Sequence, residues 1–299
     1  MGLTAIVIGS AAGGGYPQWN CSCDVCRLAW AGDPRVRART QASLAVSADG
    51  KRWSLLNASP DLRAQIQSTK ALQPSGKRES PIDAVVLTGA EIDQTAGLLS
   101  LRERSRFAVM ATAATLAAVA DNPMFAALAA DVVKRHAITP GMRFTLAGDL
   151  EAELFMVPGK VPLYLEGANP ETAEESAANV GVEITNGAKR IAYIPGAAMM
   201  TPALHRRLSR ADVILFDGTL FTDDEMIRTG TGTKAGRRMG HMPIEGEGGS
   251  IEALQGLAAR KIFVHINNTN PILVDGSPER RRVEAAGWEV GWDGMEIAL

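Results

Sequence analysis

The sequence predicts an α/β protein built as a four-layer αββα sandwich, in which two sheets pack face to face and helices cover their outer faces. Two observations favour this fold. The middle of the chain is rich in strand patterns with short turns, and the C-terminal part alternates strand and helix patterns. No internal repeat and no Pro/Ser-rich linker divides the chain, so we expect a single domain over residues 1–299.

The N-terminal half is expected to start with a buried strand, Thr4–Ile8, and a glycine-rich turn at 9–15. This turn lacks the G-x-G-x-x-G spacing, and no Lys-Ser/Thr pair follows it, so we do not expect nucleotide binding. The glycines instead allow a sharp turn and close backbone approach. Further strands are expected at 43–47, 53–57 and 82–87 and from 107 onward, and helices at 61–68, 95–104, 113–120 and 124–135.

The C-terminal half is expected to start with antiparallel strands and to continue with alternating elements. Asn186-Gly187 predicts a hairpin turn between two strands, and the polar segment 166–178 is expected to be an exposed loop. The expected strands are 143–146, 150–157, 180–185, 190–194, 213–216 and 261–266 and a final pair within 288–298; the expected helices are 202–209, 223–228, 250–257 and 278–286, with a glycine-rich loop at 229–239.

The composition excludes several classes of protein. The 299 residues are 46% hydrophobic and carry a net charge of −2, without the basic excess of a nucleic-acid binder. The first apolar stretch, 5–8, is too short for a signal peptide, and no run approaches the ~18–20 apolar residues of a membrane span. We therefore expect a soluble, cytoplasmic protein; its oligomeric state stays open, with a homodimer as one possibility.

Three cysteines lie within the six-residue run Cys21-Ser22-Cys23-Asp24-Val25-Cys26. An odd, clustered set in a reducing compartment favours metal binding over disulfides. Thiolates suit zinc, and a structural site takes four ligands, so Cys21, Cys23 and Cys26 predict a structural zinc site in an N-terminal loop. We expect His241, which follows the glycine-rich loop, as the fourth ligand, with His265 as the competitor.

A second motif follows the expected strand at 82–87. The run Thr88-Gly89-Ala90-Glu91-Ile92-Asp93-Gln94-Thr95-Ala96-Gly97 resembles the T-H-x-H-x-D-H-x-x-G signature of the metallo-β-lactamase superfamily, with three histidines replaced by Gly89, Glu91 and Gln94. In that superfamily an Asp and a His at later strand ends complete the metal centre, which points here to Asp217 and His265. The resemblance implies a second, catalytic metal site of Glu91, Asp93, Asp217 and His265, whose oxygen-rich set suits iron or manganese better than paired zinc.

The chain also resembles the PqqB family, which takes part in pyrroloquinoline quinone (PQQ) biosynthesis. The resemblance covers nearly the whole chain; its blocks are 9–15, 17–23, 56–61, 157–163, 216–219, 239–241 and 264–271. The family usually shows Asp-His where this chain has Asp93-Gln94. Similar phosphodiesterases of phosphonate metabolism complete a Cys-x-Cys-x-x-Cys zinc loop with a downstream His, which favours His241.

The resemblance implies a role in making PQQ from a ribosomal peptide that contains Glu and Tyr. The first hypothesis is an iron-dependent oxygenase that hydroxylates the tyrosine-derived ring of a crosslinked Glu–Tyr precursor, with Lys160, Arg39 or Arg237 as partners for substrate carboxylates. The alternative is a non-catalytic PQQ binder or carrier. A metal-dependent hydrolase is the least favoured hypothesis, because the first-turn histidines are absent.

Overall fold

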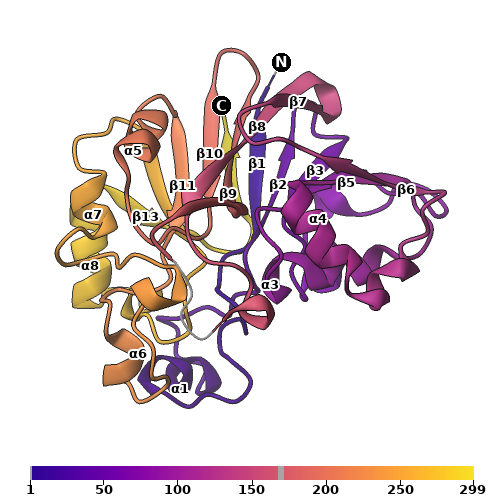
Figure 1. The fold of residues 1–299 in the computed structure, drawn as a ribbon. Helices are drawn as coiled ribbons and strands as arrows, with labels where there is room; N and C mark the ends of the chain where they lie inside the picture. The colour runs from indigo at the N-terminus through magenta and orange to yellow at the C-terminus, as the bar shows by residue number, and fades with distance from the viewer. Residues whose placement is uncertain (1, 168–171) are drawn as a thin grey trace.

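Two mixed sheets of seven strands each pack face to face in the computed structural model, which describes residues 2–167 and 172–299 (Figure 1). This architecture confirms the predicted αββα fold class. The first sheet has the order β14-β1-β2-β3-β4-β5-β6, with β1 at Thr4–Gly9, β2 at Ser43–Ser47, β3 at Trp53–Leu56, β4 at Ile82–Val86, β5 at Phe107–Ala111, β6 at Val133–Ala137 and β14 at Met295–Ala298. The second sheet has the order β13-β12-β11-β10-β9-β8-β7, with β7 at Arg143–Leu146, β8 at Leu150–Pro158, β9 at Glu175–Thr185, β10 at Arg190–Ile194, β11 at Val213–Asp217, β12 at Arg260–Val264 and β13 at Trp288–Val290.

Helices cover the outer face of each sheet. The α-helices are α1 at Asp24–Trp30, α2 at Leu62–Ser68, α3 at Ile92–Thr95, α4 at Ala113–Ala120, α5 at Pro202–Leu208, α6 at Glu225–Arg228, α7 at Ser250–Ala253 and α8 at Pro278–Ala285. Buried residues of α2 and α4 pack on the first sheet, and those of α1, α5, α7 and α8 pack on the second. The shortest of these helices cannot be stable alone, so packing on the sheets maintains them.

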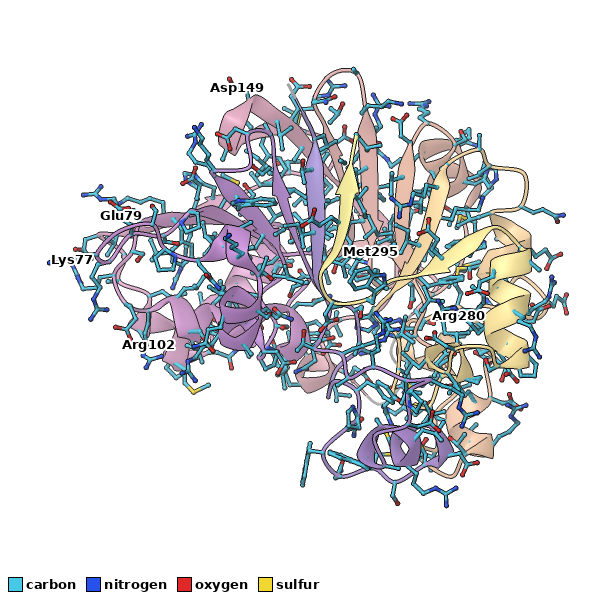
Figure 2. All side chains as sticks on the ribbon, turned by 180° about the vertical axis from the view of Figure 1, so that it is seen from behind. Lys77, Glu79, Arg102, Asp149, Arg280 and Met295 are labelled. Atoms are coloured by element: carbon cyan, nitrogen blue, oxygen red, sulfur yellow. The ribbon has the colours of Figure 1, made fainter. Side chains whose placement is uncertain are left out.

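The strands near the centre of the sandwich are apolar on both faces. In β1, Ala5 and Val7 point into the core between the sheets, while Ile6 and Ile8 point toward the outer helices. This alternation explains why such strands read as continuous apolar runs. Met295 of β14 belongs to the same inter-sheet core, and Figure 2 shows it beside β1, whereas charged side chains such as Lys77 point outward from a distant edge.

The carboxyl ends of several strands meet at one edge of the sandwich. Strands β10, β11 and β12 run parallel to one another, as do β3, β4 and β5, so the turns that follow them emerge together. The glycine-rich turn after β1 joins this edge, because Ala12 donates its N–H to the carbonyl of Ile266 at 2.8 Å and Ile266 donates to Ser10 at 2.9 Å. Polar side chains on these turns are therefore brought together from distant parts of the sequence.

The predicted helix at 124–135 is wrong. A short 3₁₀ turn at Pro123–Ala127 leads instead into β6, which pairs in parallel with β5. The apolar spacing in this segment reflects the burial of Phe125 and Leu128 under α4 rather than a continuous helix. Pairing with the edge of the sheet outweighs local helix propensity here.

Three other expectations are corrected in part. The segment expected as a helix at 95–104 starts earlier, in α3, and continues as a 3₁₀ helix at Ala96–Leu101. Of the expected loop at 166–178, residues 168–171 lie outside the described residues, and 175–178 belong to β9. The last two strands are not paired with each other, because β13 joins β12 and β14 joins β1.

The Asn186-Gly187 hairpin turn between β9 and β10 is confirmed. No helix within the described ranges is long and apolar enough to cross a bilayer.

Gly97 lies where the 3₁₀ segment crosses the turn before α2, and a side chain there has no room. A Cβ on Gly97 would lie 2.1 Å from the Ser59 carbonyl oxygen and 2.8 Å from that of Ala58. We expect Gly97→Ala to lower the free energy of unfolding by about 3 kcal/mol, measured by urea denaturation. The control Gly2→Ala, whose Cβ makes ordinary contact at 3.5 Å, should change it by less than about 0.5 kcal/mol. Equal effects of the two substitutions would contradict this account.

Candidate functional site

The three cysteines form one compact group at the start of α1. Their sulfur atoms all lie within 4.8 Å of one another, and no disulfide links them. Burial raises the pKa of Cys23 to about 12, so three adjacent thiols cannot all ionise without a compensating cation. A zinc ion supplies that charge and deprotonates a coordinating thiol outright. The donor set therefore fits a structural zinc ion.

Asn268, four residues beyond the end of β12, completes this group. Its backbone oxygen lies 3.8 Å from the sulfurs of both Cys23 and Cys26, and its side-chain amide lies 3.2 Å from the sulfur of Cys21. In a tetrahedral site, a sulfur and an oxygen ligand are separated by roughly 3.6 Å. Asn268 therefore stands where a fourth, oxygen ligand belongs.

His241, expected as the fourth zinc ligand, lies elsewhere. Its Nδ1 atom is 2.8 Å from Asp217 Oδ2, and its ring stacks on that of His265 with the centroids 5.1 Å apart. Ligand atoms of Asp217, His241 and His265 lie within 4.8 Å of one another. The structure thus corrects the expected grouping: His241 joins the second site, because the buried Asp217 carboxylate provides it with a charged partner that the cysteine loop does not.

Asp217 ends β11 and is fully buried, which requires a dense set of partners. Its Oδ2 atom accepts the Ala197 N–H at 3.0 Å, and its Oδ1 atom accepts the N–H and the hydroxyl of Thr219 at 3.0 and 2.6 Å. Burial alone would raise the pKa of Asp217, but the neighbouring imidazoles of His241 and His265 outweigh it and hold the pKa below the usual value. The carboxylate is therefore ionised and fixed in orientation.

His265 lies between two polar partners directly after β12. Its Nε2 atom is 2.9 Å from Asp93 Oδ2, and its Nδ1 atom is 2.8 Å from the Thr219 hydroxyl. Its backbone has φ of +55°, a left-handed conformation that a non-glycine residue adopts at a cost, often at functional sites. Burial lowers the pKa of His265, but the hydrogen bond to Asp93 and its charge raise it above the usual value. The Asp93 carboxylate therefore favours the protonated form of the imidazole in the absence of a metal.

Glu91 and Gln94, at the start of α3, do not point at this group. The Gln94 side chain accepts the Glu91 N–H at 3.1 Å in a capping box, and it donates to the Thr88 hydroxyl at 3.3 Å. The Glu91 carboxylate is 2.9 Å from Lys160 Nζ and accepts the Leu163 N–H at 3.1 Å. The expected ligand Glu91 is thus diverted by an ion pair, whereas Asp93 remains beside His265.

A cavity of about 620 Å³ opens beside the second site. Asp93, His241 and His265 form part of its wall. Its apolar lining includes Leu163, Tyr164, Met226 and Met239, and its charged lining includes Glu91, Lys160, Glu166 and Lys234. The volume and the mixed lining suit a small acidic molecule with an apolar or aromatic body.

Only one of the three basic residues expected to bind substrate lies at the cavity. Lys160 lines it. Arg39 is buried beneath the glycine-rich turn, where its guanidinium donates to the Gly291 carbonyl. Arg237 donates to the carbonyls of Glu247 and Gly248 at 2.9 and 3.3 Å. Arg39 and Arg237 therefore support loops rather than face a ligand.

Sequence reasoning did not identify Thr219 or Asn268 as site residues. Thr219 follows Asp217 by two residues, and its hydroxyl contacts Asp217, His241 and His265. Asn268 follows His265 by three residues and reaches the cysteines. The only available signal was their place in the polar turns that follow buried strands, where such residues more often cap a turn.

Comparison with known proteins gives a consistent set of relatives. A family model described as a beta-lactamase superfamily domain matches residues 52–266. Coenzyme PQQ synthesis protein B of Methylorubrum populi is 55% identical over 299 residues, which cover 99% of this chain and 100% of that protein. The protein of the same name from Rhizobium meliloti is 54% identical over 298 residues, covering 99% of this chain and 98% of the relative.

Solved structures give the same result. The crystal structure of Zn²⁺-bound PqqB from Methylobacterium extorquens matches with a TM-score of 0.97 and 54% identity, covering 99% of this chain and 100% of the other. A diphosphatase of the PhnP family matches with a TM-score of 0.68 and 20% identity, covering 100% and 98%. The second likeness concerns the fold alone.

Because the Asp93 carboxylate favours the protonated form of His265, an ion at the second site competes with a proton for this imidazole. We expect the apparent affinity for Mn²⁺ to rise about tenfold per pH unit from about pH 5.5 to about pH 6.5, and to flatten above the raised pKa of His265. Calorimetric titration in buffers of different ionisation enthalpy measures both the affinity and the proton release. A pH-independent affinity without proton release would contradict the assignment of His265.

The separate placement of His241 and the cysteines leads to a second test. His241→Ala should weaken Mn²⁺ binding at least about tenfold while leaving about one zinc per chain, as measured by elemental analysis. The matched variant Cys26→Ser should do the reverse, losing zinc more readily than Mn²⁺. Loss of zinc from His241→Ala would show instead that His241 serves the cysteine site.

Proposed function

Because the chain belongs to the coenzyme PQQ synthesis protein B family of the metallo-β-lactamase superfamily, we propose that it is an iron-dependent oxygenase of PQQ biosynthesis. Its substrate is a precursor in which a glutamate and a tyrosine are crosslinked, and the reaction hydroxylates the tyrosine-derived ring. The insertion of one oxygen atom into a ring C–H bond releases the second atom as water and consumes two electrons and two protons. An external reductant is therefore part of the reaction.

The observation that carries this proposal is the composition of the second site. Asp217, His241 and His265 present one carboxylate and two imidazoles within 4.8 Å. Two histidines and one carboxylate with open positions are the ligand set of non-haem Fe(II) oxygenases. Bound iron supplies the one-electron chemistry that lets dioxygen react with an aromatic ring. A dinuclear hydrolase is disfavoured, because Gly89 offers no ligand and Glu91 and Gln94 are engaged elsewhere.

Other residues hold this set in place. Thr219 contacts all three members of the set, and the Ala197 N–H fixes the Asp217 carboxylate. Asp93 holds the His265 ring and is itself a candidate ligand, since its Oδ2 lies 2.9 Å from Nε2. The apolar part of the cavity places the substrate ring beside the site and excludes water from it.

We further propose that Cys21, Cys23, Cys26 and Asn268 bind a structural zinc ion. Support comes from the oxygen of Asn268 at 3.8 Å from two sulfurs and from the Zn²⁺-bound relative. This site lies outside the cavity wall, and its role is to join the N-terminal loop to the segment after β12.

The alternative is a non-catalytic carrier that binds PQQ itself. The cavity supports this alternative because Lys160 and Lys234 line it and can pair with acidic groups of a quinone. The two functions differ in turnover, because a carrier binds PQQ without transforming the precursor.

The deciding experiment loads the protein with Fe(II) under anaerobic conditions and then adds labelled dioxygen, ascorbate and the crosslinked precursor. We expect a product heavier by one labelled oxygen atom, detected by mass spectrometry. Protein loaded with Zn²⁺ serves as the matched control and should give no product, because Zn²⁺ has no redox chemistry. Unchanged precursor despite bound iron at about one ion per chain would refute the oxygenase and leave the carrier.

A further inference from the structure

Glu166 is a buried carboxylate on the cavity wall that attracts cations from separate parts of the chain. Its Oε1 atom lies 2.6 Å from Lys160 Nζ. Its Oε2 atom lies 3.7 Å from Lys234 Nζ and 3.8 Å from Arg238 Nη1. The Glu166 side chain is only 7% exposed, and that of Lys160 only 12%. Ammonium and guanidinium groups that converge on one point in this way are suited to binding any carboxylate placed there.

This point belongs to the same cavity as the metal-site residues. Lys160, Glu166 and Lys234 line the cavity together with His241 and His265. Lys160 also packs next to the residue before His241, since its Cγ atom would lie 3.4 Å from a Cβ on Gly240. A molecule that reaches the metal site can therefore also reach the cations around Glu166.

The segment that carries Glu166 is anchored mainly by polar contacts. Leu163, Tyr164 and Leu165 are 60%, 45% and 54% exposed, so little apolar burial holds them. Among the described residues, its anchors besides Glu166 include the Leu163 N–H on Glu91 at 3.1 Å and the Tyr164 hydroxyl on the Ala90 carbonyl at 2.8 Å. Replacing the Glu166 carboxylate by another one would thus cost the segment little buried surface.

The charges at this point are stable around neutral pH. Burial lowers the pKa of Lys160, but its hydrogen bonds to Glu166 and Glu91 outweigh burial and raise the pKa above the usual value. Burial likewise raises the pKa of Glu166, but the Lys160 hydrogen bond and the charges of the three cations hold it below the usual value. The contact is therefore one between full charges.

We propose that Lys160 and Lys234, assisted by Arg238, form a carboxylate-binding subsite for the substrate, and that the Glu166 side chain occupies this subsite when no ligand is bound. The ligand class is an acidic aromatic molecule, which rests on the proposed function. Its ring lies along the apolar lining near Met226 and Met239, and its carboxylate takes the place of Glu166. Glu166 acts as an internal competitor. The affinity for the ligand therefore depends on how much more strongly the ligand carboxylate binds these cations than the Glu166 carboxylate does.

The test uses PQQ, an aromatic quinone that carries carboxylates, titrated into the full-length, metal-loaded protein and followed by calorimetry. Glu166→Gln keeps the size of the side chain and removes its charge, so we expect PQQ to bind about tenfold more tightly. Lys234→Ala removes a cation from the subsite, so we expect PQQ to bind about tenfold more weakly.

Matched controls come from exposed ion pairs outside the cavity. Glu151→Gln removes the partner of Arg143, and Lys189→Ala removes the partner of Asp212. Neither should change the Kd for PQQ. Methyl-esterified PQQ, which lacks the carboxylate charges, should bind the wild type and Glu166→Gln equally.

Weaker or unchanged binding of PQQ by Glu166→Gln overturns the proposal. An unchanged Kd for Lys234→Ala overturns it as well. The absence of saturable binding to both the wild type and Glu166→Gln has the same consequence. These outcomes are independent of turnover. If the expected shifts appear but the labelled-oxygen experiment gives no product, the subsite stands and the oxygenase function fails. If product forms but neither variant changes the Kd, the subsite fails alone.

Discussion

The burial of the Asp217 carboxylate at the end of β11 is the constraint on which the rest of the site depends. A fully buried, ionised carboxylate is tolerated only with several hydrogen bonds and a cation nearby. Its two oxygens take the N–H groups of Ala197 and Thr219 and the Thr219 hydroxyl, and the remaining demand is for positive charge. The Asp93 and Asp217 carboxylates raise the pKa of His265, which favours its cationic form, and a bound metal ion would supply further positive charge. The same buried carboxylate that is costly for the fold therefore makes this place a candidate site for a cation.

The segment after β12 links this site to the cysteines. His265 faces the candidate metal centre, Ile266 bonds with the glycine-rich turn, and Asn268 contacts all three sulfurs. Only two residues separate His265 from Asn268. A zinc ion on the cysteines would thus hold the far end of the segment whose first residue has a strained backbone. Under the proposed zinc site, the N-terminal loop would help to keep His265 in a conformation that the chain alone disfavours.

The sequence predicted most strands of the two sheets because apolar runs such as that of β11 are buried on both faces. It also identified Asp93, Asp217 and His265, because their order along the chain resembles that of the superfamily's metal ligands. It placed His241 with the cysteines because the reach of a glycine-rich loop cannot be read from spacing. The hydrogen bond between His241 and the Asp217 carboxylate fixes the position of the residue that follows the loop. The two residues are 24 positions apart, and a contact of this kind leaves no periodic pattern in the sequence. The helix expected at 124–135 failed for the same reason, since pairing with β5 is a contact between distant residues.

The departures from the metallo-β-lactamase signature are more than missing ligands. Gln94 stands where the superfamily has a histidine, and it closes the first turn of α3 instead of facing a metal. Glu91 stands at another histidine position, and it binds Lys160, which in turn binds Glu166. Glu91, at a position where the superfamily has a metal-binding histidine, thus belongs here to a network of charges that extends along the cavity wall. Under the proposed function, a centre with a single ion keeps open coordination positions, and the cations of the cavity wall hold an acidic substrate beside it. Both changes support the proposed oxidation of a carboxylate-bearing ring over hydrolysis by a bridging water.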